Sequence, residues 1–429
     1  MYTTTVVTQV MQACLPLMHA ARWCALRDVV VSAVNGHALG LVALAVGTPR
    51  TTKVRHRVKC VDRLLGNTHL EAHRLDLYTA LARQWLTGLP QLLIVVDWSS
   101  LTADMQWHWL RASVVCDGRS ITLYEEVHPR KHLGSLAVHK RFIKRLAQLL
   151  PKSAHPPIVM TDAGFRNPWF RLIAAQGWQW VGRVRNRDFV RRNEAEDWKP
   201  AKQLYEQARS VAADLGAYET VRNHPLKCRL VRVKHSPKGR KHRYASGKDQ
   251  NNSTARKCAS RHREPWLLSC SPSLGHLNAE AVVRLYAQRM RIEEEFRDTK
   301  NVVLGAGLAL SRSHGQQRLQ ALLLIGHIAQ MAKRLIGEAA KGAQLHLQLM
   351  STNRKERAEL SVMMLAKRVI DSPELLRKLK APWPGWHVLR SQVSAAINRA
   401  VAADSWGNLR VWLYFSPRYG SFPQALGER

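Results

Sequence analysis

Apolar and polar residues along the first 80 positions recur with the period of an α-helix. In residues 54–65, "VRHRVKCVDRLL", apolar side chains appear every three or four positions, with cations among the residues between them. This spacing gives a helix one apolar face and one basic face. We therefore expect the N-terminal region, residues 1–82, to be helical, with its cations directed outward.

The pattern then changes to short apolar, β-branched runs, which are typical of strands. The runs "QLLIVVD" and "PPIVMTD" end on Asp97 and Asp162, so we expect each aspartate to emerge at the end of a buried strand. Between them, two further strand patterns meet at Asp117-Gly118, a dipeptide favoured in tight hairpins, and a helical pattern follows. Strands alternating with helices predict an α/β fold with a mixed sheet.

A helical pattern also covers "YAQRMRIEEEFRDTK", residues 286–300. In one continuous helix, at about 100° per residue, Tyr286, Arg289, Glu293 and Lys300 project within an arc of roughly 60°. The ordinary alternative is a solvated helix whose charges pair at i,i+4. The apolar stretch that begins at Leu319 contains Gln320 and His327, so it indicates a buried core helix rather than a membrane span.

The charge balance changes the picture, because 66 Lys and Arg face only 31 Asp and Glu, a formal net charge of +35. A surplus spread along the chain favours an extended nucleic-acid footprint, and includes Lys53, Arg57, Lys59 and Arg63 of the basic N-terminal helix. Seven cysteines form no C-x-x-C pair, and the N-terminus lacks a secretory pattern. We expect a cytoplasmic protein with free thiols and no membrane partner.

Asp97, Asp162 and Glu293 are candidates for a metal site. Carboxylates from strand ends and a packed helix can hold two Mg²⁺ ions that activate an oxygen attacking a phosphodiester, and Mn²⁺ suits the same ligands. Arg289 and Lys300 would supply positive charge to the phosphate, and Tyr286 a hydrogen bond. An aspartate after a strand is, alternatively, often a turn residue.

The segments "VVDWS", "IVMTDAGFRNPWF", "GWQWVGRVR" and "EPWLLS", together with the spacing Y-x2-R-x3-E-x6-K, resemble the transposases of the bacterial insertion-sequence-four family. The resemblance implies an RNase H-like, mixed-sheet α/β catalytic core with a β-rich insertion, flanked by helical N- and C-terminal regions. The implied segments are a DNA-binding domain at 1–82, core parts at 90–187 and 271–345, a basic insertion at 188–270 and a C-terminal, possibly dimerising region at 346–429.

The same resemblance implies a chemistry. Asp97, Asp162 and Glu293 would form the catalytic, metal-binding DDE triad, and Trp266 would stack on a base flipped out of the duplex. Such an enzyme cuts both strands of double-stranded DNA through a hairpin and joins the 3′ ends to a target, as a homodimer on DNA. Two other readings stay open, a non-transposing nuclease on the same fold and a non-catalytic DNA-binding repressor.

Overall fold

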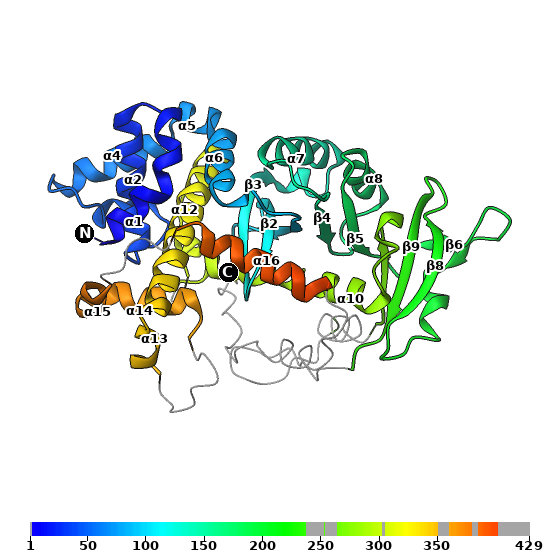
Figure 1. Ribbon diagram of the computed structural model, residues 1–429. Coiled ribbons are helices and arrows are strands. Elements are labelled where there is room, and N and C mark those ends of the chain that lie inside the picture. Colours follow the sequence, from blue (N-terminus) through cyan, green and yellow to red (C-terminus); the bar gives the residue numbers. More distant parts are fainter. Residues whose placement is uncertain are drawn as a thin grey trace. The chain divides into compact units, whose positions relative to one another are not determined.

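The computed structural model describes residues 2–236, 253, 264–302, 305–350, 360–379 and 385–401 (Figure 1). The chain divides into two compact units. The first comprises Met1–Val159, Ala175–Trp178 and Gln288–Ile397. The second comprises Met160–Ala174, Gln179–Ala287 and Asn398–Arg429. The predicted basic loop between 237 and 263, apart from residue 253, lies outside the described residues.

The first unit begins with a helical region, as the sequence predicts. Its helices are α1 (Tyr2–Met11), α2 (Ala20–Val34), α3 (Leu41–Val46), α4 (Val54–Leu65), α5 (Thr68–Ala72) and α6 (Arg74–Leu86). The apolar face of α4 buries Val61, Leu64 and Leu65, while most of its cations stay at the surface. Periodicity alone therefore locates this region and orients its basic helix correctly.

Three antiparallel strands of the first unit carry the next part of the chain: β1 (Leu93–Ser100), β2 (Trp107–Cys116) and β3 (Arg119–Pro129). The predicted hairpin is confirmed, and Gly118 in its turn has a φ of 74°, which favours glycine. The amides of His155 and Ile158 donate to the carbonyls of Pro90 and Leu92, both at 2.9 Å. Strand β4 (Ile158–Thr161) therefore starts parallel to β1, and the pairing is mixed.

The predicted α/β class is confirmed. Helix α7 (Leu136–Leu149) lies between β3 and β4 in the chain, and α8 (Asn167–Ala175) precedes β5 (Gln179–Arg183). The order β1-β2-β3-α7-β4-α8-β5 is that of an RNase H-like core. One boundary differs from expectation, because β1 continues to Ser100 and Asp97 lies inside the strand rather than at its end. The hydrogen bonds of β1 with β2 carry the strand past the apolar run.

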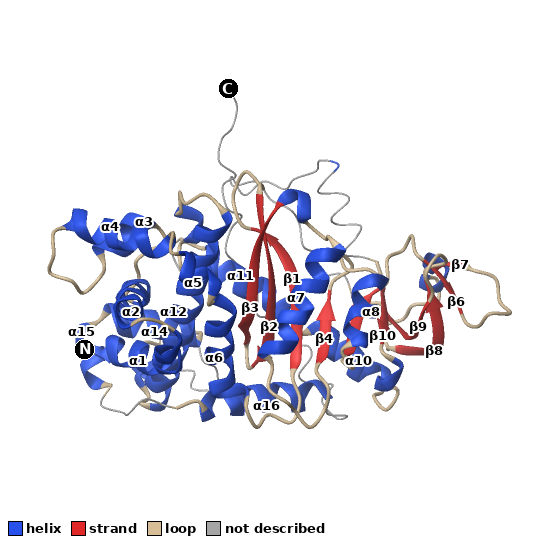
Figure 2. Ribbon diagram, turned by 90° about the horizontal axis from the view of Figure 1, so that it is seen from above, coloured by secondary structure: helices blue, strands red, loops and turns tan. Residues whose placement is uncertain are grey.

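The rest of the first unit is helical, with α11 (Met290–Lys300) packed against β1 and β3 (Figure 2). The following helices are α12 (Gln316–Gly342), α13 (Leu345–Gln348), α14 (Val362–Asp371), α15 (Pro373–Lys378) and α16 (His387–Val401), of which the first unit includes α16 up to Ile397. Helix α12 is buried along most of its length and contacts α1, α2 and α14, as expected of a core helix. Among the described residues, none of the helices is both long and apolar enough to cross a membrane.

The second unit contains a strand order β5-β10-β9-β8-β6-β7, in which neighbours run antiparallel. Its further strands are β6 (Phe189–Arg191), β7 (Lys199–Pro200), β8 (Ala213–Thr220), β9 (Leu226–Val233) and β10 (Trp266–Cys270). Helix α10 (Ala279–Ala287) packs against β5 and β9. The β character expected for the segment after residue 188 is therefore present in the structure.

The expectation of one continuous helix from Tyr286 to Lys300 is wrong. Helix α10 ends at Ala287, α11 begins at Met290, and Arg289 is the residue that caps α11. The two helices pack against different strands, α10 on β5 and β9 and α11 on β1 and β3. Packing of each helix on its own strands overrides the helical period of the sequence here. Tyr286 therefore belongs to the second unit and Arg289 to the first.

Candidate active site

Helix α11 presents Glu293 to Asp97 of strand β1, and Arg289 joins them. One guanidinium nitrogen, Nη1 of Arg289, lies 2.7 Å from Oε1 of Glu293 and 3.5 Å from Oδ2 of Asp97. Arg289 and Glu293 are four residues apart, a spacing that places two side chains on the same side of a helix turn. A single positive group thus contacts both carboxylates, which shows that they face one point.

The two carboxylates have the donor chemistry of a site for a hard divalent cation, which takes oxygen ligands. The Asp97 side chain is only 13% exposed and its Oδ1 accepts a hydrogen bond from the Trp98 amide at 2.8 Å, which leaves Oδ2 directed to Arg289. The described residues contain no group of three or more His, Cys, Asp or Glu side chains placed to hold a metal ion. Among these residues, Asp97 and Glu293 form a pair of carboxylates that shares the guanidinium of Arg289.

Asp162 directly follows β4 and is described within the second unit. Its Oδ1 accepts a hydrogen bond from the Gly164 amide at 2.8 Å, and its carbonyl accepts one from Phe165 at 3.3 Å. This turn is the ordinary role of an aspartate after a strand. The prediction that Asp162 ends a strand is confirmed. Its membership of a triad with Asp97 and Glu293 stays a prediction.

Lys300, the last residue of α11, lies near the same strand. Its Nζ donates a hydrogen bond to Oγ of Ser99, two positions after Asp97, at 2.8 Å, and lies 5.7 Å from the centre of the Trp109 ring. Burial, together with the smaller effect of the nearby charge of Arg111, lowers the pKa of Lys300 to about 8. Glu293 and Lys300 of α11, with Arg289 just before the helix, therefore contact one another or β1.

The described geometry agrees with a comparison of the sequence with family models. Residues 88–331, more than half of the chain, match the model of the transposase DDE domain. The chain belongs to the transposase DDE domain family. DDE transposases act on DNA and use divalent metal ions, which is the chemistry that the paired carboxylates and the cationic chain indicate.

The similarity of this DDE domain chain to individual proteins is low. No curated protein matches the chain. A solved structure of a piggyBac transposase synaptic complex with hairpin DNA is similar at 12% sequence identity and a TM-score of 0.39. The similarity covers 95% of this chain and 84% of that one. A likeness this remote carries no argument about the chain.

Glu294 and Glu295, the two residues after Glu293, have structural roles that the sequence did not indicate. Glu295 is buried and accepts hydrogen bonds from the Ser113 hydroxyl at 2.8 Å and the Ser120 hydroxyl at 2.6 Å, as well as from Thr122. Burial alone would raise the pKa of Glu295, but Arg111 and these donors hold it below its ordinary value. Glu295 therefore anchors α11 to strands β2 and β3.

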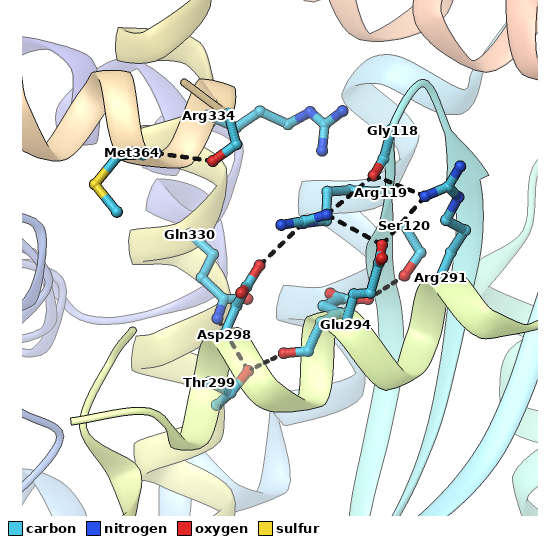
Figure 3. A network of polar contacts seen from close by, with 12 residues as sticks. Gly118, Arg119, Ser120, Arg291, Glu294, Asp298, Thr299, Gln330, Arg334 and Met364 are labelled. Carbon is cyan, nitrogen blue, oxygen red and sulfur yellow. Dashed lines mark hydrogen bonds and ion pairs between the residues drawn. The ribbon is translucent and has the colours of Figure 1, made fainter. Parts of the chain in front are cut away.

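Glu294 belongs to a second anchoring network, shown in Figure 3. Arg119, which follows the hairpin turn, contacts Glu294 at 3.0 Å and Asp298 at 3.2 Å, and Arg291 contacts Glu294 at 3.2 Å. Gln330 of α12 donates to the Thr299 hydroxyl at 2.9 Å. Contacts with both the β2-β3 hairpin and α12 thus fix the rotation of α11 about its axis. That rotation determines where Glu293 points.

Trp98, the half-buried residue after Asp97, contacts the buried His139 of α7. The indole nitrogen of Trp98 donates to Nε2 of His139 at 3.0 Å, while the Trp98 ring lies 5.6 Å from that of His128. Burial, together with the smaller effect of His128, lowers the pKa of His139 to about 4. A neutral His139 can accept the indole hydrogen bond at pH 7. No motif in the sequence pointed to His139, because its partner lies 41 positions away.

Trp266 and Tyr286 form a ring cluster in the second unit. Their ring centres are 5.0 Å apart at 81°, and the His235 ring lies 4.5 Å from Trp266 at 77°. Tyr286 is buried, whereas Trp266 is half-buried. The structure thus places Tyr286 with Trp266 rather than on one helix face with Arg289. The DNA-binding roles of both residues stay predictions.

The predicted DNA-binding cations of α4 differ in their surroundings. Lys53, Lys59 and Arg63 are exposed. Arg57 is half-buried and its Nη1 donates to the carbonyl of Val46, the last residue of α3, at 2.9 Å. Arg57 therefore has a structural role in joining α4 to α3. Nothing in the sequence separates Arg57 from its three neighbours.

Proposed function

We propose that the chain is a cut-and-paste DNA transposase of the insertion-sequence-four family, close to the transposase of transposon Tn-ten, acting on nucleoid DNA in the bacterial cytosol. It binds the terminal repeats of its element, cleaves both strands through a hairpin and joins the freed 3′ ends to target DNA. The observation that carries the proposal is the contact of Arg289 with both Asp97 and Glu293. Two carboxylates face one point within a chain of net charge +35.

In this proposal Asp97, Asp162 and Glu293 hold two Mg²⁺ ions, for which Mn²⁺ can substitute. Bound there, the ions activate the attacking oxygen and stabilise the leaving oxygen of the phosphodiester. Before DNA binds, Arg289 neutralises Asp97 and Glu293 and keeps the two carboxylates from repelling each other. Once the carboxylates have another cation, the guanidinium is available to a DNA phosphate.

Lys300 and Trp266 have separate roles. Lys300, held beside β1 by Ser99, adds positive charge near the cleaved phosphate, and binding of an anion favours its protonated form. The ring of Trp266 stacks on a flipped base, and Tyr286 and His235 pack edgewise on it and fix its plane. Two element ends must be held together for joining, so the active form on DNA is a homodimer.

The test is incubation of the purified protein with Mg²⁺ and DNA fragments that span the native flanks of its gene. Wild type is compared with Glu293→Gln and with a matched control, Glu374→Gln, whose side chain is 74% exposed on α15. Products are resolved on a denaturing gel. We expect nicks and hairpins at one fixed position with wild type and the control, and none with Glu293→Gln.

Each other outcome contradicts a part of the proposal. Binding of the flanks without cleavage under Mg²⁺ or Mn²⁺ would make the chain a DNA-binding repressor. Cleavage scattered over flanks and unrelated DNA would make it a general nuclease. Equal loss of cleavage and of binding in Glu293→Gln would give Glu293 a structural role in place of a catalytic one.

A further inference from the structure

Three exposed valines lie on α3 and at the start of the basic helix α4. Val42 is 58% exposed, and Val46 and Val54 are each 46% exposed. Val42 and Val46 are four residues apart on α3 and so share one side of it. Arg57 of α4 contacts the Val46 carbonyl, and Val54 lies one turn before Arg57. We call the surface of Val42, Val46 and Val54 the valine surface.

The charges around the valine surface favour a polyanion as its partner. Residues 29–61 contain no aspartate or glutamate. Asp28, just before this stretch, is buried and paired with Arg27 and Arg50, each at 2.8 Å. Lys53 and Arg55 are exposed on either side of Val54 in the chain, and Lys59 is exposed further along α4. Figure 2 shows α3 and α4 side by side at the margin of the helical part of the first unit.

A polyanion alone does not explain the valines, because phosphates offer nothing apolar to contact. Cations on phosphates position a protein on DNA without reading its sequence, which is read at the base edges. In the major groove, the group of a base edge that suits an aliphatic side chain is the C5 methyl of thymine. Duplex DNA offers a partner for both groups, because its phosphates can contact the cations and the thymine methyls of its major groove can contact the valines.

We propose that the valine surface contacts thymine methyls in the major groove of the terminal repeat and so contributes to its recognition. This inference rests on the proposed function and specifies the DNA that the N-terminal helices select. Lys53 and Lys59 contact phosphates, whereas Val42, Val46 and Val54 discriminate between sequences. Arg57 joins α4, which begins with Val54, to Val46 at the end of α3.

The test removes the methyl groups from the DNA. The flank fragments are prepared once with thymine and once with uracil, which pairs identically but lacks the C5 methyl, and an unrelated fragment of equal length is prepared both ways. Affinities are measured by fluorescence anisotropy. Wild type should lose about fourfold in affinity for the flanks per contacted methyl removed, and the unrelated fragment should show no such loss.

The second part of the test changes the protein in place of the DNA. The triple variant Val42→Ala, Val46→Ala, Val54→Ala should bind thymine and uracil flanks equally, with the salt dependence of wild type, since no charge is removed. The matched control is Val211→Ala, which changes a valine that is 60% exposed in the second unit, and it should keep the wild-type preference for thymine. The wild-type comparison needs no variant to fold.

The failures of the two proposals are distinguishable. A wild type that prefers its flanks over unrelated DNA but binds thymine and uracil flanks equally overturns the role of the valine surface alone. An equal thymine preference in wild type and the triple variant does the same. A wild type with no preference for its flanks removes recognition of the terminal repeats, and with it both proposals.

Discussion

Glu293 and Glu295 are two residues apart on α11, yet they have opposite surroundings. The Glu293 side chain is 42% exposed and shares Arg289 with Asp97. The Glu295 side chain is 8% exposed and is held by Ser113, Ser120, Thr122 and Arg111. A buried, satisfied carboxylate fixes the helix, and an accessible one beside a second carboxylate is available to a metal and substrate. The difference teaches that Glu295 anchors helix α11 and thereby sets the position of Glu293.

The largest expected effect is on catalysis and concerns Glu293. Glu293→Gln keeps the shape of the side chain but removes the charge that a divalent cation needs, so we expect DNA cleavage to fall by a factor of about 10³ or more. Unfolding by urea should give a free energy within about 0.5 kcal/mol of wild type, because the side chain is partly exposed. A loss of stability of several kcal/mol would erase the contrast with Glu295.

The converse substitution sharpens the comparison. Glu295→Gln leaves Arg111 without part of its buried countercharge and sets an amide against hydroxyl and amide donors. We expect the free energy of unfolding to fall by about 3 kcal/mol, measured by urea denaturation. Protein that remains folded should still cleave the flanks. Unchanged stability would show that this network does not anchor α11.

Lys300, on the same helix as Glu293 and Glu295, should make the stability of the protein depend on pH. Its pKa is lowered to about 8 in the fold from an ordinary value of 10.5, so between these pH values the unfolded chain binds more protons than the native one. Native stability therefore gains as pH rises from 8 to 10.5. The free energy of unfolding of Lys300→Met should therefore be higher than that of wild type by about 2 kcal/mol at pH 7, a figure reduced to allow for the partial exposure of Lys300. At pH 10 the difference between the two proteins should be smaller. Thermal unfolding of both proteins at pH 7 and pH 10 measures this difference in unfolding free energy. The same difference at both pH values would contradict the burial of a charged Lys300.

Trp98 tests the support behind Asp97. Trp98→Phe keeps an aromatic ring but removes the indole donor, so the buried His139 ring loses this hydrogen bond. We expect a destabilisation of about 1 kcal/mol together with a higher Mg²⁺ concentration for half-maximal cleavage. A change in stability with an unchanged Mg²⁺ requirement would confine Trp98 to packing.

The smallest effects are expected on α4. Lys59→Ala should lower the slope of log affinity for DNA against log salt by about one unit, as expected for one phosphate contact. Arg57→Ala should change that slope less and lower the thermal stability of the helical region, because Arg57 contacts the end of α3. Equal slopes for Lys59→Ala and wild type would remove Lys59 from the DNA footprint.

Local patterns predicted much of this fold. The periodicity of α4, the hairpin at Gly118 and the apolar strand ending before Asp162 all depend on neighbouring residues, and all are confirmed. The break after Ala287 was missed because it arises from α10 and α11 packing on different strands. The roles of Glu295 and His139 depend on partners far away in the chain, such as Thr122 and Trp98. Contacts between residues so far apart in the chain produce no local sequence pattern from which they could be predicted.

The most direct test of the central claim is Mn²⁺ binding, measured by electron paramagnetic resonance with flank DNA present. Wild type is compared with Asp97→Asn, Glu293→Gln and Glu374→Gln. If Asp97 and Glu293 face one cation site, both of their variants should bind Mn²⁺ at least tenfold more weakly, while Glu374→Gln binds it as wild type does. Mn²⁺ binding of wild-type strength in Asp97→Asn and Glu293→Gln would contradict the assignment.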